Sequence, residues 1–589
     1  MSKITGKAFD MDILKRMLSL AKGYKKQLII TMLLILAVST LSSVRPYLIS
    51  RMIDLAILTK DHLLVRNMFI LVVIVLLGHV LLSIAQGYYS NWIGQQIVRD
   101  MRVTLFRKIN GFKLKYFDTT PVGTLVTRVI SDIETINQAF SSGILVIVGE
   151  LLTIIFVLGF MFFLNWKFTL MVLIPIPLLV LATRIFKNAI KKSFQDVRTE
   201  VSVINTFVQE HIVGMNIVQI FNREEKEFEK FQEINKRHRG AHIKSIWAYS
   251  VFFPVVEILS AVSVGLLIFW AVLDFDVDDS ATHKIFSDVV AFILYIFMLY
   301  RPIRQLADRF NQLQMGMVGA ERVFKILDED AVMANEGEGT EMTLKGKIDI
   351  VDVSFAYNEP DWILQDLNIE INPGEMIAFV GSTGAGKSTI LNLLGRFYEF
   401  QKGEILLDDI DIRKIGINSL RQNIAVVLQD VFLFSGSIMD NITLKNPEYT
   451  LDVVIEAAKE VGAHEFIMKL PGGYDFDVKE RGAMLSVGQR QLISFIRAYV
   501  YKPRILILDE ATSSVDSESE ELIKNAQRIL TKGRTSIVVA HRLSTVIEAD
   551  RIIVLEKGRI IESGKHQELL EKDGHYKKLY DLQISHNEG

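Results

Sequence analysis

The stretch MIAFVGSTGAGKST, residues 376–389, decides the fold of the C-terminal half of this 589-residue chain. An apolar strand, Met376 to Val380, runs directly into a match to G-x-x-x-x-G-K-[ST], the pattern of a phosphate-binding loop that opens a helix. The loop residues are Gly381, Ser382, Thr383, Gly384, Ala385, Gly386, Lys387, Ser388 and Thr389. Glycines let backbone N–H groups converge on phosphate oxygens at a helix N-terminus, where the dipole also favours anions. We expect Lys387 to reach the β and γ phosphates of ATP and Ser388 to offer a hydroxyl to Mg²⁺.

Two further apolar segments end in residues suited to phosphate chemistry. Ile505 to Leu508 predicts a buried parallel strand that ends in Asp509-Glu510, where Asp509 would hold the Mg²⁺ shell and Glu510 would accept a hydrogen bond from the attacking water. Thr535 to Ala540 predicts another strand, followed by His541, which could reach the γ-phosphate. A lone histidine after a strand is more often structural, but three strands that are each followed by residues suited to phosphate binding favour a functional role for His541.

The pentapeptide LSVGQ, residues 485–489, lies fifteen residues before the strand that ends in Asp509. This pairing indicates the class of ATPase. Because the pentapeptide is not needed in the same chain to hold a nucleotide, it predicts a chain that works as a dimer.

Composition separates the chain into two halves. Half of the residues are hydrophobic and 23% are charged, and the long apolar runs lie before about Met333, whereas the rest resembles a soluble α/β domain. A net charge of -2 gives no case for nucleic acid as a partner. The absence of cysteine excludes a disulfide scaffold, a cysteine metal site and a cysteine nucleophile.

Six apolar segments are long enough to cross a bilayer, which requires about 20 residues of helix. They span residues 28–49, 68–88, 145–164, 168–186, 247–273 and 289–303. Before them, residues 11–23 predict either an amphipathic helix in the membrane interface or a short soluble helix, and no signal peptide is indicated.

Charge in the connections gives the orientation. The long connections 91–140 and 187–244 are rich in Lys and Arg, whereas the turn after the third span is short and the turn after the fifth is acidic. Because Lys and Arg mark the cytoplasmic side, both termini and both long connections are expected inside. Fifty structureless residues would be uncommon, so the spans should continue as helices into the cytoplasm. Turns near 117–123 and at Gly214 would be either contacts for a soluble domain or simple hairpin turns.

Polar and aromatic residues within the spans have two interpretations each. Arg45, Glu150 and Glu257 lie in or near apolar runs, and the two glutamates would be either a cation- or proton-handling pair or single hydrogen-bonding groups between helices. The cluster Phe292, Tyr295, Phe297 and Tyr300 could line a pocket for a flat ligand, although such residues more often face lipid or a neighbouring helix.

With these motifs in place, the whole chain resembles a half-transporter of the ATP-binding cassette (ABC) exporter family, of the bacterial multidrug and lipid type. The resemblance implies an α-helical six-span transmembrane domain in residues 1–330, with an interfacial helix and two cytoplasmic coupling helices near 117–123 and 213–221. It further implies a linker at 331–345 and an α/β P-loop nucleotide-binding domain at 346–589.

The resemblance also assigns residue roles. Tyr357 matches the aromatic residue that stacks on adenine, and Gln429 matches the glutamine that touches Mg²⁺ and senses the membrane domain. Residues 480–482 match an exporter motif beside the coupling helices, and Ser486, Gly488 and Gln489 match the signature that closes on the partner's ATP. Residues 513–516, which end at Asp516, match the loop that links the two sites, and His541 matches the switch histidine.

Val487 departs from the family pattern, which usually has glycine at this position. In heterodimeric members the subunit with an intact catalytic glutamate often carries an altered signature, so Glu510 with Val487 leaves a homodimer and a heterodimer open. The implied activity is ATP-driven export or flipping of a hydrophobic or amphipathic substrate across the bacterial cytoplasmic membrane, with membrane lipid as surroundings. The alternative is an ATP-gated channel on the same scaffold, although the complete set of hydrolytic residues favours a pump. No motif names the cargo.

Overall fold

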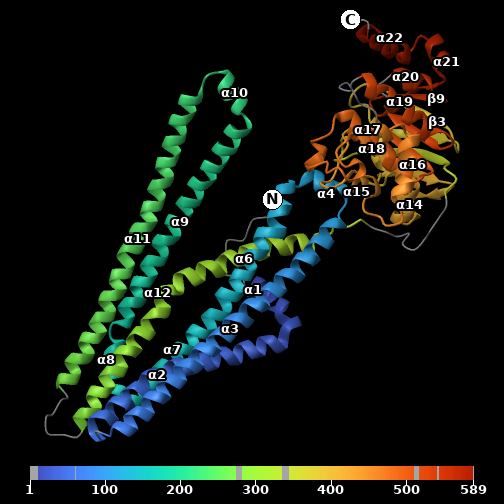
Figure 1. Ribbon diagram of the computed structural model, residues 1–589. Coiled ribbons are helices and arrows are strands. Elements are labelled where there is room, and N and C mark those ends of the chain that lie inside the picture. The colour runs from blue at the N-terminus through green and yellow to red at the C-terminus, as the bar shows by residue number, and fades with distance from the viewer. Residues whose placement is uncertain are drawn as a thin grey trace. The chain divides into compact units, whose positions relative to one another are not determined.

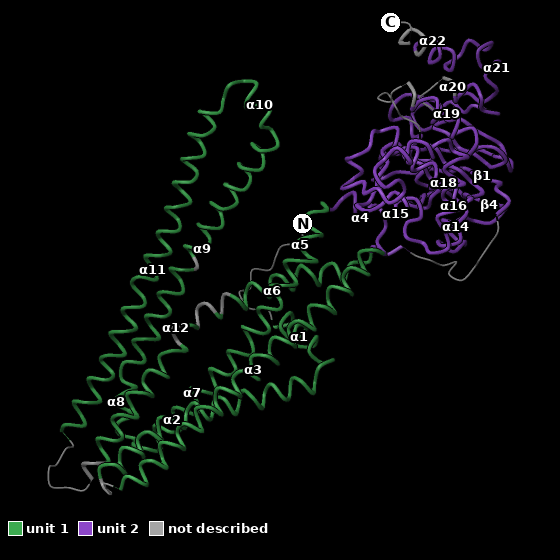
Figure 2. The backbone as a smooth tube through the Cα atoms, viewed as in Figure 1, with its two compact units in different colours: residues 1–110, 121–330 green, residues 111–120, 331–589 purple. Residues whose placement is uncertain are grey.

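The computed structural model describes residues 11–59, 61–273, 281–333, 344–509, 517–539 and 543–587. The chain divides into two compact units, which Figure 2 colours separately. Unit 1 contains Met1–Asn110 and Pro121–Asp330, and unit 2 contains Gly111–Thr120 and Ala331–Gly589. A ten-residue segment from the first half of the sequence therefore folds with the second half.

Unit 1 consists of helices, and six of its described segments are long and apolar enough to cross a membrane. Its α-helices, drawn in blue to yellow-green in Figure 1, are α1 (Met11–Leu20), α2 (Lys25–Thr59), α3 (His62–Asn110), α5 (Val122–Thr127), α6 (Ile133–Gln138), α7 (Leu145–Leu164), α8 (Trp166–Leu173), α9 (Ile176–Val213), α10 (Met215–Ile220), α11 (Glu224–Leu273) and α12 (Ala281–Asp328). The prediction of six spans is confirmed. At about 1.5 Å per residue the 49 residues of α3 extend about 74 Å, more than twice the hydrocarbon thickness, so the helices do run on past the apolar segments.

Local sequence explains two of the breaks between these helices. Asn165 ends α7 and caps α8, because its side chain accepts hydrogen bonds from the backbone N–H groups of Lys167 and Phe168 at 3.0 and 3.2 Å. Gly214 separates α9 from α10, as the sequence predicted. The short helix α10 has no buried residue.

The aromatic cluster of α12 packs against other helices. Phe292, Tyr295 and Tyr300 are fully buried, whereas Phe297 is half exposed. The Tyr295 hydroxyl donates to the Ser43 carbonyl at 2.8 Å, and the Tyr300 hydroxyl lies 2.8 Å from the Ser263 hydroxyl. Three of the four rings therefore contact neighbouring helices, in agreement with the more common of the two interpretations.

The predicted pair of glutamates lies on different helices. Glu150 is on α7, where its Oε2 atom is buried and has no hydrogen-bond partner, and Glu257 is on the exposed side of α11.

Two glycines allow α12 to approach α6 and the π-helical turn Ala139–Ile144 that joins α6 to α7. A Cβ atom on Gly316 would lie 2.0 Å from the Ala139 Cβ atom and 2.9 Å from the Thr135 carbonyl oxygen. A Cβ atom on Gly319 would lie 2.3 Å from the Thr135 hydroxyl. Small residues at such crossings let helix backbones pack closely in membranes.

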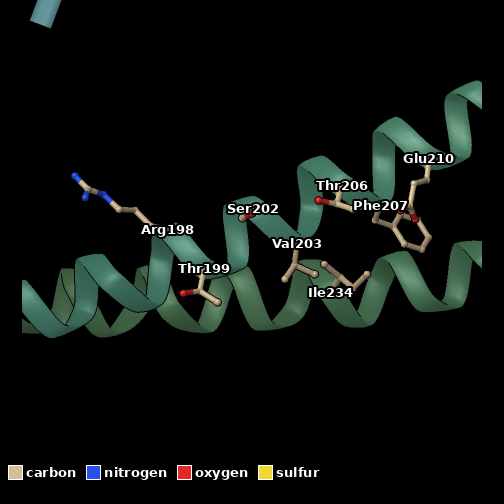
Figure 3. Close-up of a pocket in the computed structure, with 8 residues that line it drawn as sticks. All are labelled: Arg198, Thr199, Ser202, Val203, Thr206, Phe207, Glu210 and Ile234. Atoms are coloured by element: carbon tan, nitrogen blue, oxygen red, sulfur yellow. The ribbon is translucent and has the colours of Figure 1, made fainter. Parts of the chain in front are cut away.

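The helices α9 and α11 run side by side and enclose a groove of about 640 Å³ on one face. Figure 3 shows its lining, to which α9 contributes all the residues except Ile234 of α11. The residues are Arg198, Thr199, Ser202, Val203, Thr206, Phe207, Glu210 and Ile234. The groove combines apolar side chains with hydroxyls and one charge of each sign.

Unit 2 is an α/β domain with two sheets. The larger sheet has the strand order β10-β9-β3-β8-β7-β6, and the smaller has the order β2-β1-β4-β5. The strands are β1 (Ile348–Phe355), β2 (Leu364–Ile371), β3 (Met376–Val380), β4 (Lys402–Leu407), β5 (Ile410–Asp411), β6 (Ile424–Val427), β7 (Ile505–Asp509), β8 (Thr535–Val539), β9 (Arg551–Glu556) and β10 (Arg559–Gly564). The fold class predicted for this half is confirmed.

The larger sheet is parallel from β9 to β6, and only β10 runs antiparallel. Its central strand β8 is buried at every position, as expected for a parallel strand covered by helices on both faces. The helices of this unit are α4 (Leu114–Thr119), α13 (Lys387–Leu394), α14 (Ile417–Asn423), α15 (Ile438–Thr443), α16 (Leu451–Glu460), α17 (His464–Lys469), α18 (Val487–Val500), α19 (Ser517–Thr531), α20 (Leu543–Ile547), α21 (His566–Glu571) and α22 (His575–Asn587).

Candidate functional site

The phosphate loop connects β3 to α13, and its glycines adopt conformations that other residues rarely take. Gly384 and Gly386 have φ angles of +84° and +103°. A Cβ atom on Gly386 would lie 2.6 Å from the Leu364 Cδ2 atom, and one on Gly381 would lie 2.3 Å from the Leu555 carbonyl oxygen. Gly381 and Gly386 therefore leave no room for a larger residue, and Gly384 has a backbone conformation that favours glycine, as expected of a loop whose N–H groups bind phosphate.

Lys387 begins α13, and its side chain turns back into this loop. Its Nζ atom donates hydrogen bonds to the carbonyls of Gly381 and Ser382 at 2.6 and 3.0 Å. Burial lowers the pKa of Lys387, and the nearby Asp509 carboxylate offsets part of that effect. The ammonium group is thus held inside the loop that the sequence predicts to bind phosphate.

Parallel strand order brings the other candidate residues to the same edge of the sheet. Asp509 ends β7, which is separated from β3 only by β8, and Gln429 follows the end of β6. Because the carboxyl ends of parallel strands meet at one edge, Asp509 and Gln429 lie on the side of the sheet where the phosphate loop begins. Glu510, residues 513–516 with Asp516, and His541 lie outside the described residues.

The donor set fits a magnesium ion whose remaining ligands are phosphate oxygens and water. Ser388 is exposed, Asp509 is half-buried, and Gln429 is exposed, so all three offer oxygen atoms at this edge. Among the described residues there is no group of three or more His, Cys, Asp or Glu side chains that could hold a metal ion by themselves. Mg²⁺ is usually bound in this way, through one or two protein oxygens, phosphates and water.

Tyr357, the candidate for adenine stacking, is held from two directions. Its hydroxyl lies 3.3 Å from the Thr389 hydroxyl and accepts a hydrogen bond from Asn392 Nδ2 at 3.3 Å. Its ring packs edge-on against Phe355 and Tyr398, with centroid distances of 4.8 and 4.9 Å. Sequence reasoning missed Tyr398, because no motif shows that a residue four positions after the end of α13 meets Tyr357.

The signature pentapeptide forms the N-terminus of α18. Ser486 is the cap: its hydroxyl accepts from the Gln489 N–H at 3.2 Å, and its own N–H donates to Gln489 Oε1 at 3.0 Å. Ser486 is exposed, and the first N–H groups of a helix have no partner within it. Val487 is the first helical residue, and its φ is not positive, so valine replaces glycine here without backbone strain.

The exporter-type motif at 480–482 does require glycine. Gly482 has a φ angle of +69°, and a Cβ atom there would lie 2.9 Å from Leu433 Cδ1 and 2.9 Å from Arg490 Cδ. Arg490 in turn donates to the Leu485 carbonyl at 2.8 Å, which ties this turn to the start of α18.

Four large apolar side chains of unit 2 are exposed, three of them next to or shortly after Gln429 in the sequence and one directly before the signature. They are Leu428, Phe432, Phe434 and Met484, all more than half exposed. Phe432 and Phe434 form a T-shaped pair at 5.1 Å. We call these four residues the apolar patch of unit 2.

Comparison with known families agrees with both halves. Residues 28–303 match the model of the ABC transporter transmembrane region, and residues 364–513 match that of the ABC transporter ATP-binding domain, described as "ABC transporter". The first match covers the spans of unit 1, and the second covers β2 to β7 with the phosphate loop and the signature.

Relatives match along almost the full length. The chain is 36% identical to the ABC transporter ATP-binding protein YknV of Bacillus subtilis over 99% of this chain and 96% of that one. It is 34% identical to an ATP-dependent lipid A-core flippase of Syntrophus aciditrophicus, over 98% and 95% of the two chains. Among solved structures, a bacterial Atm1-family ABC exporter with ATP bound matches with a TM-score of 0.78 and 25% identity, over 95% of this chain and 98% of that one.

Proposed function

Because this chain belongs to the ABC transporter family, as an exporter with fused membrane and ATPase parts, we propose that it is a translocase. It moves a hydrophobic or amphipathic substrate across the bacterial cytoplasmic membrane at the expense of ATP. The observation that carries the proposal is the phosphate loop, with Gly384 and Gly386 at positive φ and Lys387 folded into it, in the same chain as six apolar helices. The chain binds ATP, and we propose Mg²⁺ as its partner ion.

The ATP site is shared between two chains in this proposal. The phosphate loop of one chain and the signature of its partner enclose each ATP, with Ser486 and Gly488 at the N-terminus of α18 facing the γ-phosphate. The exposure of Ser486 in the single chain supports this role, since the group would be covered only by the second copy.

We propose the following roles in ATP binding and hydrolysis, supported by the position of Lys387, Asp509 and Gln429 at one edge of the large sheet. Mg²⁺, when bound by Ser388, Gln429 and the Asp509 shell, neutralises phosphate charge. Lys387 binds the β and γ phosphates, and Tyr357 stacks on the adenine. Glu510 orients the attacking water, His541 contacts the γ-phosphate, and Asp516 links the two sites; these three are proposals from sequence alone.

Two apolar surfaces support transmission between chains. Around α10, four apolar side chains are exposed: Ile217 and Ile220 within the helix, Val213 at the end of α9, and Phe221 directly after α10. We propose that α10 of one chain docks on the apolar patch of unit 2 in its partner, and that the groove on α9 and α11 faces the second chain. ATP binding would close the ATPase units, and these contacts would pass the closure to the membrane helices and open the cavity outward.

The second chain is either a copy of this one or a different half-transporter. Val487 lies in ordinary helical backbone, so the replacement of the usual glycine adds an exposed apolar side chain and leaves the backbone conformation unchanged. In this proposal the added side chain faces the partner's ATP. The positive connections favour cytoplasmic termini, and the relatives' names make lipids and drugs the substrate classes to test first.

The test uses the full-length chain, expressed alone and reconstituted in inverted vesicles. We expect Mg²⁺-dependent ATP hydrolysis and ATP-driven uptake of a fluorescent lipid or a hydrophobic dye. Glu510→Gln should bind ATP but trap a closed dimer with greatly slowed hydrolysis, whereas Lys387→Ala should weaken nucleotide binding or abolish turnover. Uptake that persists without hydrolysis would indicate a channel, and activity that appears only with a second half-transporter would indicate a heterodimer.

A further inference from the structure

The segment 111–120, which contains α4, is anchored to the ATPase unit through its backbone. The N–H of Lys113 donates to the Ala331 carbonyl at 2.9 Å, and the N–H of Met333 donates to the Gly111 carbonyl at 3.1 Å. Phe112, between these bonds, is buried. These contacts fix where α4 begins within unit 2.

Three side-chain contacts then connect the segment to residues near the nucleotide site. The Tyr398 hydroxyl donates a hydrogen bond to Asp118, which lies on α4. Lys113 Nζ lies 3.2 Å from Glu399 Oε2, and Lys115 Nζ donates to the Tyr357 carbonyl at 3.0 Å. Burial and the bond to Asp118 raise the pKa of Tyr398, so the phenol keeps its proton at neutral pH.

Tyr398 also touches the residue that we assign to the base. Its ring meets the Tyr357 ring at 4.9 Å and 90°, the edge-to-face geometry that aromatic pairs prefer. The hydroxyl of Tyr357 is held by Thr389 and Asn392 of α13, the helix that opens at the phosphate loop.

The turn that carries Tyr398 is firmly held. It follows α13 directly, and the buried Arg396 donates to the carbonyls of Ile412 and Ile415 at 3.3 and 3.2 Å. The backbone on both sides of the Tyr398 ring is therefore fixed, and the ring lies between Tyr357 and Asp118.

We propose that Tyr398 is a positioning residue that joins the adenine-stacking ring of Tyr357 to α4 through Asp118, so that α4 responds to the base of the nucleotide and not only to its phosphates. This inference rests on the proposed function, because it assumes that Tyr357 stacks on adenine. A base on the Tyr357 ring restricts that ring, the edge contact restricts Tyr398, and the hydrogen bond restricts Asp118. Since α4 is joined by the chain to α3 and α5 of unit 1, the base then influences the membrane half.

The test compares two ligands on the full-length protein in lipid nanodiscs. AMP-PNP carries adenine and three phosphates, whereas tripolyphosphate carries the phosphates alone, and both are used with Mg²⁺ at concentrations that displace a fluorescent nucleotide completely. Hydrogen–deuterium exchange is followed in the peptide that covers residues 111–120. We expect AMP-PNP to slow exchange there by about three- to tenfold, the range for one typical intramolecular hydrogen bond, and tripolyphosphate to leave it nearly unchanged.

The variants separate base sensing from general support of the fold. Tyr398→Phe keeps the ring but loses the hydroxyl, and it should remove most of the difference between the ligands, the Lys115 contact to Tyr357 being left. AMP-PNP affinity should stay within about twofold of wild type, since the ring that packs against Tyr357 is retained. Asp118→Ala should act in the same way, and Asp118→Asn, which can still accept a hydrogen bond, should restore part of the difference. Tyr501→Phe is the matched control, because its hydroxyl donates to the Thr443 carbonyl at 2.8 Å, away from α4.

Several results would overturn the inference. These are equal protection of 111–120 by both ligands in the wild type, wild-type protection in Tyr398→Phe, or a loss of protection throughout the ATPase unit in that variant, which would indicate a structural role. Failure of the exporter proposal would show differently, as absence of ATP-driven uptake by the wild-type protein whatever the exchange pattern.

Discussion

Gly386 offers the sharpest test of how the phosphate loop binds ATP, through the single change Gly386→Ala. The residue caps α13 with a φ angle of +103°, and an alanine Cβ would lie 2.6 Å from Leu364 Cδ2 and 3.3 Å from the Ile363 carbonyl oxygen. A side chain in left-handed backbone costs about 1–2 kcal/mol. Turning Leu364 away from a good rotamer adds about 0.5–1.5 kcal/mol.

The loop can relieve this strain by moving its N–H groups out of the cradle, and ATP binding must reverse that movement. A cost of about 2 kcal/mol then appears as a Kd for ATP that is about thirtyfold weaker. Titration with a fluorescent ATP analogue, on full-length protein in detergent, measures this value.

Gly374→Ala is the matched control. Gly374 has a φ angle of +79° in the turn before β3, with open space around a Cβ atom, so it carries comparable backbone strain away from the phosphates. It should lower stability and leave the Kd for ATP unchanged. Wild-type affinity in Gly386→Ala, or equal loss of affinity in both variants, would refute the role assigned to the loop.

Three further predictions concern stability and pH. Gly316→Val should lower the thermal midpoint of the full-length protein or prevent its folding, because the Ala139 Cβ atom and the Thr135 carbonyl leave no room for a side chain. Gly159→Val is the control and should be tolerated, since nothing lies within 4 Å of a Cβ atom there. Equal midpoints for the two variants would contradict the close crossing of α12. Thr535→Val should destabilise the ATPase unit by about 1–3 kcal/mol, since the buried hydroxyl donates to the Gly346 carbonyl at 2.8 Å and accepts from the Gly374 N–H at 3.0 Å; denaturant unfolding that matches wild type would exclude this. Burial lowers the pKa of His566. The stability that the neutral imidazole contributes should therefore be complete above about pH 6.5, the pKa of an unfolded histidine, and should decline as the pH falls below that value. His566→Gln should make the free energy of unfolding less dependent on pH in this range.

Local patterns in the sequence were sufficient to predict an element where a few neighbouring residues determine its backbone conformation. The strand Met376–Val380 has the predicted bounds, and β7 ends one residue beyond the predicted run, because a parallel strand is read from a short apolar stretch and from the glycines or carboxylates that follow it. The helix break at Gly214 was equally local. The spans were found from their apolar segments, but their true lengths depend on polar continuations such as Glu224 to Lys244 of α11, where hydropathy gives no signal.

Contacts between distant parts of the sequence could not be predicted in the same way. Nothing in residues 111–120 shows that Asp118 meets Tyr398, 280 positions later, because that pairing depends on tertiary packing. The same limit applied to Tyr295 and Tyr300, which sequence alone left between a ligand pocket and helix packing. Their buried hydroxyls, each with a partner on another helix, decided the question.

The division of the chain has a consequence for exchanging parts between related proteins. Since Gly111–Thr120 folds with unit 2, a chimera cut once at residue 330 would carry a foreign α4 and separate Lys113 from Ala331 and Asp118 from Tyr398. The ATPase module of this protein is discontinuous in sequence, and a transplant that keeps its native contacts needs three junctions, at 110/111, 120/121 and 330/331.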